Sequence, residues 1–474
     1  MRFNSLVYFG FLAVVVAVLW LLPVRARKAW LLVASCVFYG SWHAPFLGLL
    51  LTAATLNHLG ARWIVAATDR HRRGTVVIAA NLLLLAVFKY ADWALSGVSG
   101  ISTWLGGPAV PLPGWVLPLG ISFYLFECIS YTVDLVRKRE TLHPFFDFLL
   151  FIAYFPKLIA GPILRAKEFL PQLAKHRPPD AASVRTALRE LLIGLFLKVV
   201  IADGLSQGVD AAFSKSPASL GVLDVWVMAI GFGLQIYFDF SSYSRMAIGS
   251  ARLCGIELVE NFNHPYVARS PADFWARWHM SLSRWIRDYV FYPLVGRKTS
   301  LGAMVRAALG SMLLCGLWHG AGWGYVLWGL AHGLLVAGYH VMTFSGRGRP
   351  PVKSAVRSLI GAVVTFAGVS LAWLLFRAPS AADGFALLGR ALSPLGHLNR
   401  ALSGTFYLEV FLVTLAVWSA PWVSGRLESG WSRLQTRPRR LAFAAGLEGL
   451  AWGLLFAVSL VYLRGQTAFI YFQF

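Results

Sequence analysis

The segment Leu317-Trp318-His319-Gly320-Ala321-Gly322-Trp323 places one histidine between glycine and tryptophan residues. The residues before and after it are mostly apolar, so His319 is expected to lie at membrane depth. A titratable side chain is costly there and by default indicates a functional site. Histidine also gives or takes a proton near neutral pH. His319 is therefore the first candidate catalytic residue.

The composition of the chain is that of a membrane protein. Of its 474 residues, 57% are hydrophobic and 14% are charged, and the mean hydropathy is +0.62. Long apolar runs recur along the whole length, which is typical of a polytopic helical bundle. No segment is polar enough for a separate soluble domain, so the sequence predicts one all-α membrane domain over residues 1–474.

The net charge of +22 does not indicate nucleic-acid binding. Most of the 43 Lys and Arg residues lie in loops between apolar runs, as expected where cytoplasmic loops are positive. No basic and aromatic soluble module is present to bind nucleic acid, so the charge indicates topology and contact with anionic membrane lipid. The cysteines are scattered without metal or redox spacing, and the sequence predicts no bound metal and no bound cofactor.

About 11–12 apolar segments approach the roughly 20 residues that a bilayer requires. They are residues 5–23, 30–49, 50–66, 75–92, 114–135, 190–204, 221–244, 304–318, 323–343, 356–376, 406–424 and 441–463. Segment 144–162 is interrupted by Pro156 and Lys157, which indicates a re-entrant or interfacial helix. The distribution of basic residues places both termini outside and residues 245–303 in the cytoplasm. Positive charges follow the first apolar run, so it is expected to be a retained helix, not a signal peptide.

The cytoplasmic segment 245–303 contains a predicted amphipathic helix. Ser270-Pro271-Ala272-Asp273 is typical of a helix start. Apolar and aromatic residues then recur at helical spacing, and the arginines lie on another face. These arginines either anchor the helix to anionic lipid or bind the phosphates of a cytoplasmic donor. The candidate donor-binding residues are Arg277, Arg284 and Arg287.

Further polar residues near this helix have more than one interpretation. His279 follows Trp275 by four residues and is expected on the apolar side. It is either a buried histidine bonded to a backbone carbonyl or a second polar group facing a reaction tunnel. Asp239, near the end of an apolar helix, is expected to pair with a base or a helix end. The run from Asn261 to Tyr266 predicts a turn, because Pro265 disfavours helix at the residue before it.

Several motifs occur in order along most of the chain. They are Leu117-Pro118-Leu119-Gly120-Ile121-Ser122-Phe123-Tyr124, Tyr154-Phe155-Pro156-Lys157, Ala160-Gly161-Pro162-Ile163, Tyr237-Phe238-Asp239-Phe240-Ser241, Asn261-Phe262, Pro265-Tyr266, Phe274-Trp275, Trp278-His279, Ser281-Leu282-Ser283, Gly316-Leu317-Trp318-His319-Gly320 with Trp323, and Phe469-Ile470-Tyr471-Phe472-Gln473-Phe474. Together these motifs resemble the membrane-bound O-acyltransferase family, and the resemblance is strongest to the bacterial branch that includes the membrane protein of alginate O-acetylation.

The resemblance implies a helical bundle around a transmembrane tunnel, in the inner membrane of a bacterium. It implies that His319 is catalytic and that His279 is the second signature residue, a position that is His or Asn across the family. Asp239, Asn261, Trp278 and Trp318 lie in matching segments and are expected to support the site. The implied donor is acetyl-CoA or another acyl thioester, used as a substrate. The implied partners are a periplasmic transferase related to SGNH hydrolases and proteins of polysaccharide biosynthesis and export.

The corresponding mechanism gives each histidine a role. Neutral His319 would take the proton of an acceptor hydroxyl, and His279 would orient the thioester or stabilise the developing oxyanion. Tyr471, beyond the last predicted helix, would either relay the acyl group to a periplasmic partner or belong to the aromatic belt of the membrane.

Three alternatives remain open from the sequence. One is transfer of a D-alanyl group from a carrier protein to teichoic acid. Another is a proton-coupled transporter, which would explain membrane histidines but predicts internal repeats with broken helices. The third is an export scaffold without enzymatic activity, for which His319 would be dispensable.

Overall fold

The computed structural model describes the chain except residues 298, 345–353, 394–399, 436–437, 464–468 and 471–474, and the side chains of 427–444. The fold is all-α, with 79% helix and no strand in the residues that are described, as the sequence predicted. These residues form two compact units. Unit 1 contains residues 1–191, 244–260 and 320–322, and unit 2 contains 192–243, 261–319 and 323–474.

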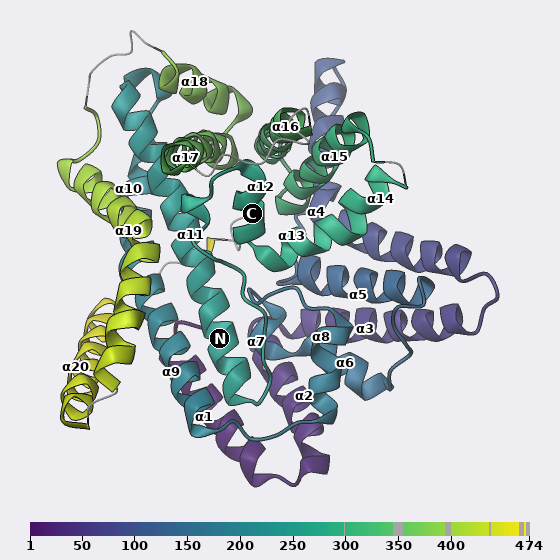
Figure 1. Cartoon of the computed structure of the whole chain (residues 1–474). Coiled ribbons are helices and arrows are strands. Elements are labelled where there is room, and N and C mark those ends of the chain that lie inside the picture. Colours follow the sequence, from purple (N-terminus) through teal and green to yellow (C-terminus); the bar gives the residue numbers. More distant parts are fainter. Residues whose placement is uncertain (298, 345–353, 394–399, 436–437, 464–468, 471–474) are drawn as a thin grey trace. The chain divides into compact units, whose positions relative to one another are not determined.

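Unit 1 is built from the helices of the first part of the chain. In it α3, α4 and α5 pack together, and α6 packs on α2 and α3 (Figure 1). The helices are α1 (Leu6–Leu21), α2 (Val24–Gly40), α3 (Ala44–Val65), α4 (Arg70–Trp104), α5 (Ile121–Val136), α6 (Phe145–Ala153), α7 (Phe155–Leu158), α8 (Ala166–Ala174), the first part of α9 (Ala181–Phe196) and the last part of α11 (Val222–Leu253).

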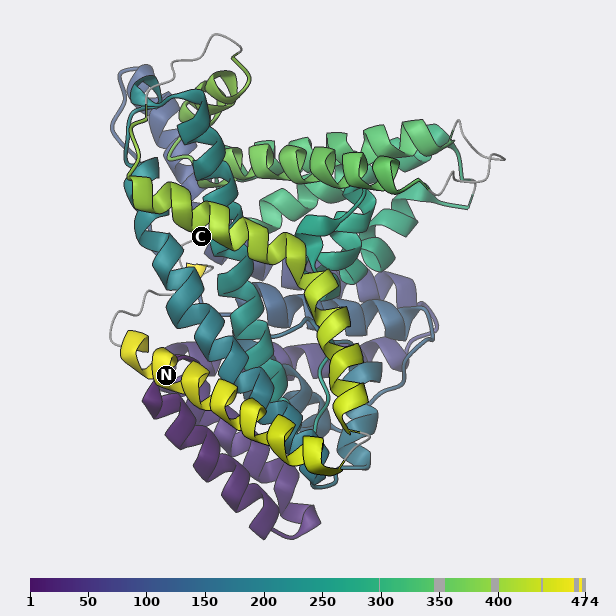
Figure 2. The same cartoon turned by 60° about the vertical axis from the view of Figure 1, so that its left-hand side comes forward.

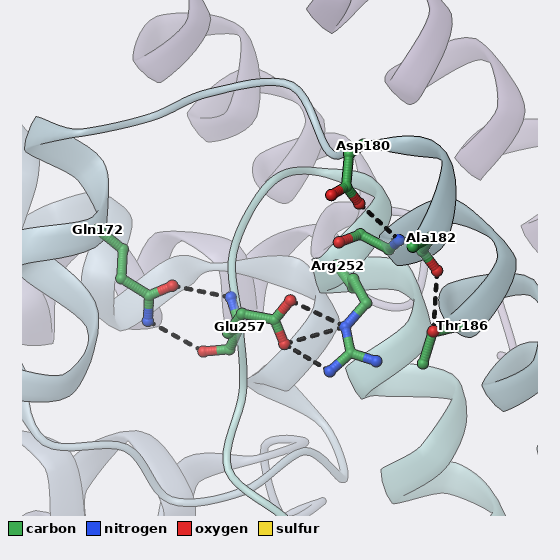
Figure 3. Close-up of polar contacts among 7 residues, drawn as sticks. Gln172, Asp180, Ala182, Thr186, Arg252 and Glu257 are labelled. Carbon is green, nitrogen blue, oxygen red and sulfur yellow. Dashed lines mark hydrogen bonds and ion pairs between the residues drawn. The ribbon is translucent and has the colours of Figure 1, made fainter. Parts of the chain in front are cut away.

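Two groups of polar contacts lie on the helices of unit 1 (Figure 3). The Gln172 amide of α8 donates to the Glu257 carbonyl and accepts from the Glu257 backbone N–H. The Glu257 carboxylate in turn accepts from the Arg252 guanidinium, near the end of α11. Asp180 accepts from the Ser183 N–H and so caps the start of α9. The bonds of Glu257 therefore connect α8 with the end of α11.

Unit 2 holds most of the family-like motifs quoted above. Within it α16 packs against both α15 and α17 (Figure 1), and α19 bends (Figure 2) and contains Pro421. Its elements are the π-helix η1 (Leu197–Ala202), α10 (Asp203–Phe213), η2 (Pro217–Ser219), most of α11, η3 (Pro265–Val267), α12 (Pro271–Arg277), α13 (Met280–Ile286), η4 (Arg287–Phe291), α14 (Tyr292–Val295), α15 (Leu301–His319), α16 (Trp323–Phe344), α17 (Ala355–Arg377), α18 (Ala381–Ala391), α19 (Gly404–Gln435) and α20 (Pro438–Tyr462).

Eight of the described helices are long and apolar enough to cross a bilayer, and the chain is a multi-pass membrane protein. They are Ala44–Val65, Arg70–Trp104, Val222–Leu253, Leu301–His319, Trp323–Phe344, Ala355–Arg377, Gly404–Arg426 and Ala445–Tyr462. The predicted segment 190–204 is part of a longer helical run that contains the π-helix η1. The predicted boundary between two helices at residues 49 and 50 was wrong. The helices are instead separated at residues 41–43, and α3 has Pro45 in its first turn.

Glycines allow α15 and α16 to approach closely. A Cβ atom on Gly329 of α16 would lie 2.5 Å from the Met312 carbonyl oxygen of α15, and one on Gly333 would lie 3.2 Å from the Leu309 Cα. Backbone atoms cannot give way as a flexible side chain can. This contact holds the helix that ends at His319 against α16, as small residues do between membrane helices.

Replacing Gly329 with alanine is expected to destabilise unit 2. The added methyl group forces the two backbones apart, and overpacking of this kind typically costs about 1–3 kcal/mol. The matched control is Gly338→Ala on the same helix, where a Cβ meets nothing within 4 Å and alanine favours the helix by up to about 1 kcal/mol. Thermal unfolding in detergent measures both. Equal midpoints for the two variants would contradict the close contact.

Candidate active site

His319 is the last residue of α15 and is held by aromatic rings. Its side chain is 5% exposed. The ring centroid lies 4.8 Å from that of Trp318, 4.9 Å from that of Trp328 and 5.4 Å from that of Phe376, each near a perpendicular arrangement. Rings from α15, α16 and α17 therefore set the position of this imidazole in a largely apolar surrounding.

The predicted single amphipathic helix around His279 was wrong. The chain forms α12 and α13, and between them His279 has a left-handed backbone with φ +41°. This conformation costs a non-glycine residue roughly 1–2 kcal/mol. Long-range backbone bonds support it: the Met280 N–H donates to the Asn261 carbonyl over 2.8 Å, and the Asn263 N–H donates to the Arg277 carbonyl over 3.0 Å. Local periodicity cannot reveal such a break.

The Asn261 side chain also supports the turn. Its Oδ1 accepts from the Ser281 hydroxyl over 2.6 Å and from the Ser281 backbone N–H over 3.3 Å. Trp278 packs on the other side of the turn, stacked on Phe274 at 5.5 Å and 5.3 Å from Trp373 between ring centroids. Asn261 and Trp278 thus hold the backbone that presents His279.

The left-handed turn places the His279 ring next to Trp318. His279 is fully buried, with its ring 4.6 Å from Phe240 and 6.1 Å from Trp318 between centroids. Trp318 thus contacts both His279 and His319. Burial lowers the pKa of His279 to about 3, so the imidazole is neutral in the physiological range. A neutral imidazole suits the orienting role that the sequence predicted for His279.

Asparagine is expected to replace His279 better than alanine does. Asparagine tolerates the left-handed backbone and keeps a polar group. Alanine is strained in this backbone and has no polar group. We expect His279→Asn to retain more acyl transfer than His279→Ala, by about 10-fold or more if the side chain binds the oxyanion. The His279→Gly variant removes the backbone strain but supplies no polar side chain. Activity in His279→Gly equal to that in His279→Asn would assign the residue to backbone geometry alone.

Two of the three predicted donor arginines line a cavity of about 370 Å³. Arg284 and Arg287 contribute to this cavity together with Trp275, Met312 and His340. Arg277 does not line it and instead pairs with Asp273, with 2.7 Å between Nε and Oδ1. The cavity combines cationic groups with apolar walls, as a ligand with an anionic end and an apolar chain requires.

Asp239 pairs with a base, as the sequence predicted. Its Oδ1 lies 2.5 Å from the Nζ of Lys198, which also lies 2.7 Å from the Oδ1 of Asp203. The other oxygen of Asp239 accepts from the Ile470 backbone N–H over 2.6 Å. Phe469 packs on Tyr243 and Phe240, so the described end of the chain is buried in unit 2. Tyr471 follows directly but lies outside the described residues, and its relay role stays a prediction.

His332 and Lys198 were not among the predicted site residues. His332 lies on α16, four residues after Trp328, and its ring is 4.7 Å from the Trp328 ring that also contacts His319. The four-residue spacing of Trp328 and His332 was a usable signal. Lys198 is a cation in an apolar segment, where an acidic partner is expected.

Trp318 thus contacts two buried histidines, His279 and His319, and Met280, which follows His279, lines the cavity with cationic and apolar walls. The sequence model of the membrane-bound O-acyltransferase family matches residues 76–375, which include His279 and His319. The chain belongs to this family and is an O-acyltransferase, which confirms the resemblance read from the motifs.

Its relatives are named as acyl-transferring proteins that act on alginate, peptidoglycan or teichoic acid. The "Probable alginate O-acetylase" of Azotobacter vinelandii is 35% identical over 427 residues, covering 88% of this chain and 84% of that protein. The "Peptidoglycan O-acetyltransferase" of Helicobacter pylori is 32% identical, covering 74% of this chain and 71% of that protein. The "Teichoic acid D-alanyltransferase" of Bacillus subtilis is 31% identical, covering 47% of this chain and 58% of that protein.

Proposed function

We propose that this protein transfers an acetyl group from a cytoplasmic thioester, acetyl-CoA, across the membrane for O-acetylation of an extracytoplasmic polysaccharide. The observation that carries the proposal is the contact of His319 and His279 with the same ring, that of Trp318. The similarity to alginate and peptidoglycan acetylating proteins over most of the chain supports acetyl as the acyl group and a polysaccharide as the acceptor.

The reaction needs a base and a group that orients the carbonyl. His319 takes the proton of the attacking hydroxyl as its oxygen bonds to the thioester carbonyl carbon. His279, neutral because of its burial, orients the carbonyl and stabilises the negative charge that develops on its oxygen. The C–S bond then breaks, and the proton held by His319 passes to the thiolate, so that an O-acetyl ester and a free thiol leave the site.

The donor enters through the cavity beside α13. Arg284 and Arg287 bind its phosphates there, since a guanidinium matches phosphate oxygens in charge and geometry. The distribution of basic residues among the loops favours a cytoplasmic position for this cavity and a periplasmic position for both termini. The protein acts in the bacterial inner membrane. A periplasmic SGNH-like transferase completes the transfer to the polysaccharide, with Tyr471 as the candidate relay, and proteins of polysaccharide biosynthesis and export are further partners.

D-alanyl transfer to teichoic acid is the second candidate. It is favoured by the similarity to the D-alanyltransferase of Bacillus subtilis, which extends over about half of this chain. The smaller overlap makes this candidate weaker than acetylation.

Chemical analysis of the envelope polysaccharide tests the proposal. Mild base releases the ester-linked acid from polysaccharide of the natural host, of a strain lacking the gene and of a strain with the gene restored. We expect acetate that disappears on deletion and returns on restoration. Alanine with this behaviour would establish the second candidate, and an unchanged ester content would overturn both.

A further inference from the structure

We propose that His332 is a donor-binding residue, whose Nε2 hydrogen-bonds an amide group of the thioester donor between its phosphate end and its reacting carbonyl. This inference rests on the proposed function and adds a residue to the site. His332 is 1% exposed on α16. Its Nε2 has no hydrogen-bond partner in the described part of the chain.

The surroundings of His332 are aromatic. Its ring centroid lies 4.7 Å from that of Trp328, 5.1 Å from that of Trp275 and 5.9 Å from that of Phe274. A polar group buried among such rings without a partner destabilises the fold, and its presence requires an explanation. A ligand that brings its own polar groups supplies one.

The indole rings around His332 are a second source of buried polar groups. Buried N–H groups without a partner among the described residues belong to Trp275, Trp328 and Trp373. An indole nitrogen donates only, so these groups require an acceptor. A chain with amide carbonyls, such as the arm that joins the phosphates of coenzyme A to its thiol, provides acceptors for the indoles and a partner for His332 while its methylene groups contact the rings.

The position of His332 links the cavity to His319. His340, Val336, His332 and Trp328 follow each other at intervals of four residues, which places them along one face of α16. His340 and Val336 line the cavity that contains Arg284 and Arg287. Trp328 contacts His319. A donor that reaches from the arginines to His319 along this face therefore passes His332.

The test compares two variants of the full-length protein by steady-state kinetics with acetyl-CoA. His332→Phe keeps an aromatic ring but removes the nitrogen, and it is expected to raise KM for acetyl-CoA by about 10-fold, the effect of one buried hydrogen bond. His332→Gln restores a polar group and is expected to recover most of this loss. The binding of coenzyme A, measured by calorimetry, is expected to weaken in the same order.

The matched control is His58→Phe. His58 is a buried histidine of α3 that also lies between phenylalanine rings, 5.3 Å and 5.8 Å from the centroids of Phe145 and Phe148, and its replacement should leave KM unchanged. An unchanged KM in folded His332→Phe with active wild-type protein would overturn this inference alone. A lowered unfolding midpoint with unchanged KM would assign His332 to structure. Wild-type protein without acetyl-CoA turnover would instead overturn the proposed function.

Discussion

Replacing His319 with glutamine is expected to slow acyl transfer by about 10²–10⁴-fold, the usual contribution of a positioned general base. Glutamine matches the polarity of the imidazole but cannot take a proton from the acceptor hydroxyl. Because the rings of Trp318, Trp328 and Phe376 define the pocket of this side chain, the fold should persist. The rate of thiol release from acetyl-CoA, measured with saturating acceptor, reports the loss.

The control for His319 is an exposed histidine. His71 lies in the first turn of α4 at the protein surface, and His71→Gln should retain the full rate. A normal rate in folded His319→Gln would remove His319 from the chemistry and favour the scaffold interpretation.

Replacing Lys198 with methionine is expected to lower the free energy of unfolding by about 3–5 kcal/mol, because a buried charge loses its partner. The Lys198 side chain is 1% exposed and the side chains of Asp203 and Asp239 are 6% and 3% exposed. Without the ammonium group, two carboxylates remain in a poorly solvated interior. The effect should appear as a lower unfolding midpoint in detergent and a shorter half-life of activity.

An exposed ion pair provides the comparison. The Arg245 side chain, 42% exposed, lies 2.8 Å from Glu190, and Arg245→Met should cost only about 0–1 kcal/mol. Asp239→Asn keeps the shape and an acceptor for the Ile470 N–H and should cost less than Lys198→Met. Similar midpoints for Lys198→Met and Arg245→Met would show that the buried triad does not stabilise the fold.

The long apolar helices could be predicted from the sequence because each run is bounded by polar or turn residues. The predicted segments 323–343 and 356–376 match α16 and α17 closely. The break at residues 41–43 separates runs that are both apolar, so hydropathy does not mark it. Pro45, in the first turn of α3, was the available signal. The π-helix η1 and the left-handed His279 depend on contacts distant in sequence and could not be predicted locally.

Some residues of the candidate site could likewise be predicted from the sequence, and others could not. His319 and His279 could be recognised because they lie in motifs: a tryptophan precedes each of them, and a glycine follows His319. The pairing of Lys198 with Asp239 joins residues 41 positions apart in the sequence, and pattern alone could not select this partner. His332 was missed because one histidine on an apolar helix face is more often part of a core than of a site, and only its aromatic surroundings and unsatisfied nitrogen distinguish it.

Turnover of radiolabelled acetyl-CoA by the purified wild-type protein in liposomes tests the central claim most directly. Free thiol and labelled acetyl product are measured with and without a proton gradient, because acyl transfer from a thioester needs no gradient whereas proton-coupled transport does. The account predicts thioester cleavage that is independent of the gradient and is lost in His319→Gln. Well-folded protein that cleaves no acetyl-CoA and moves solute only with a gradient would contradict it.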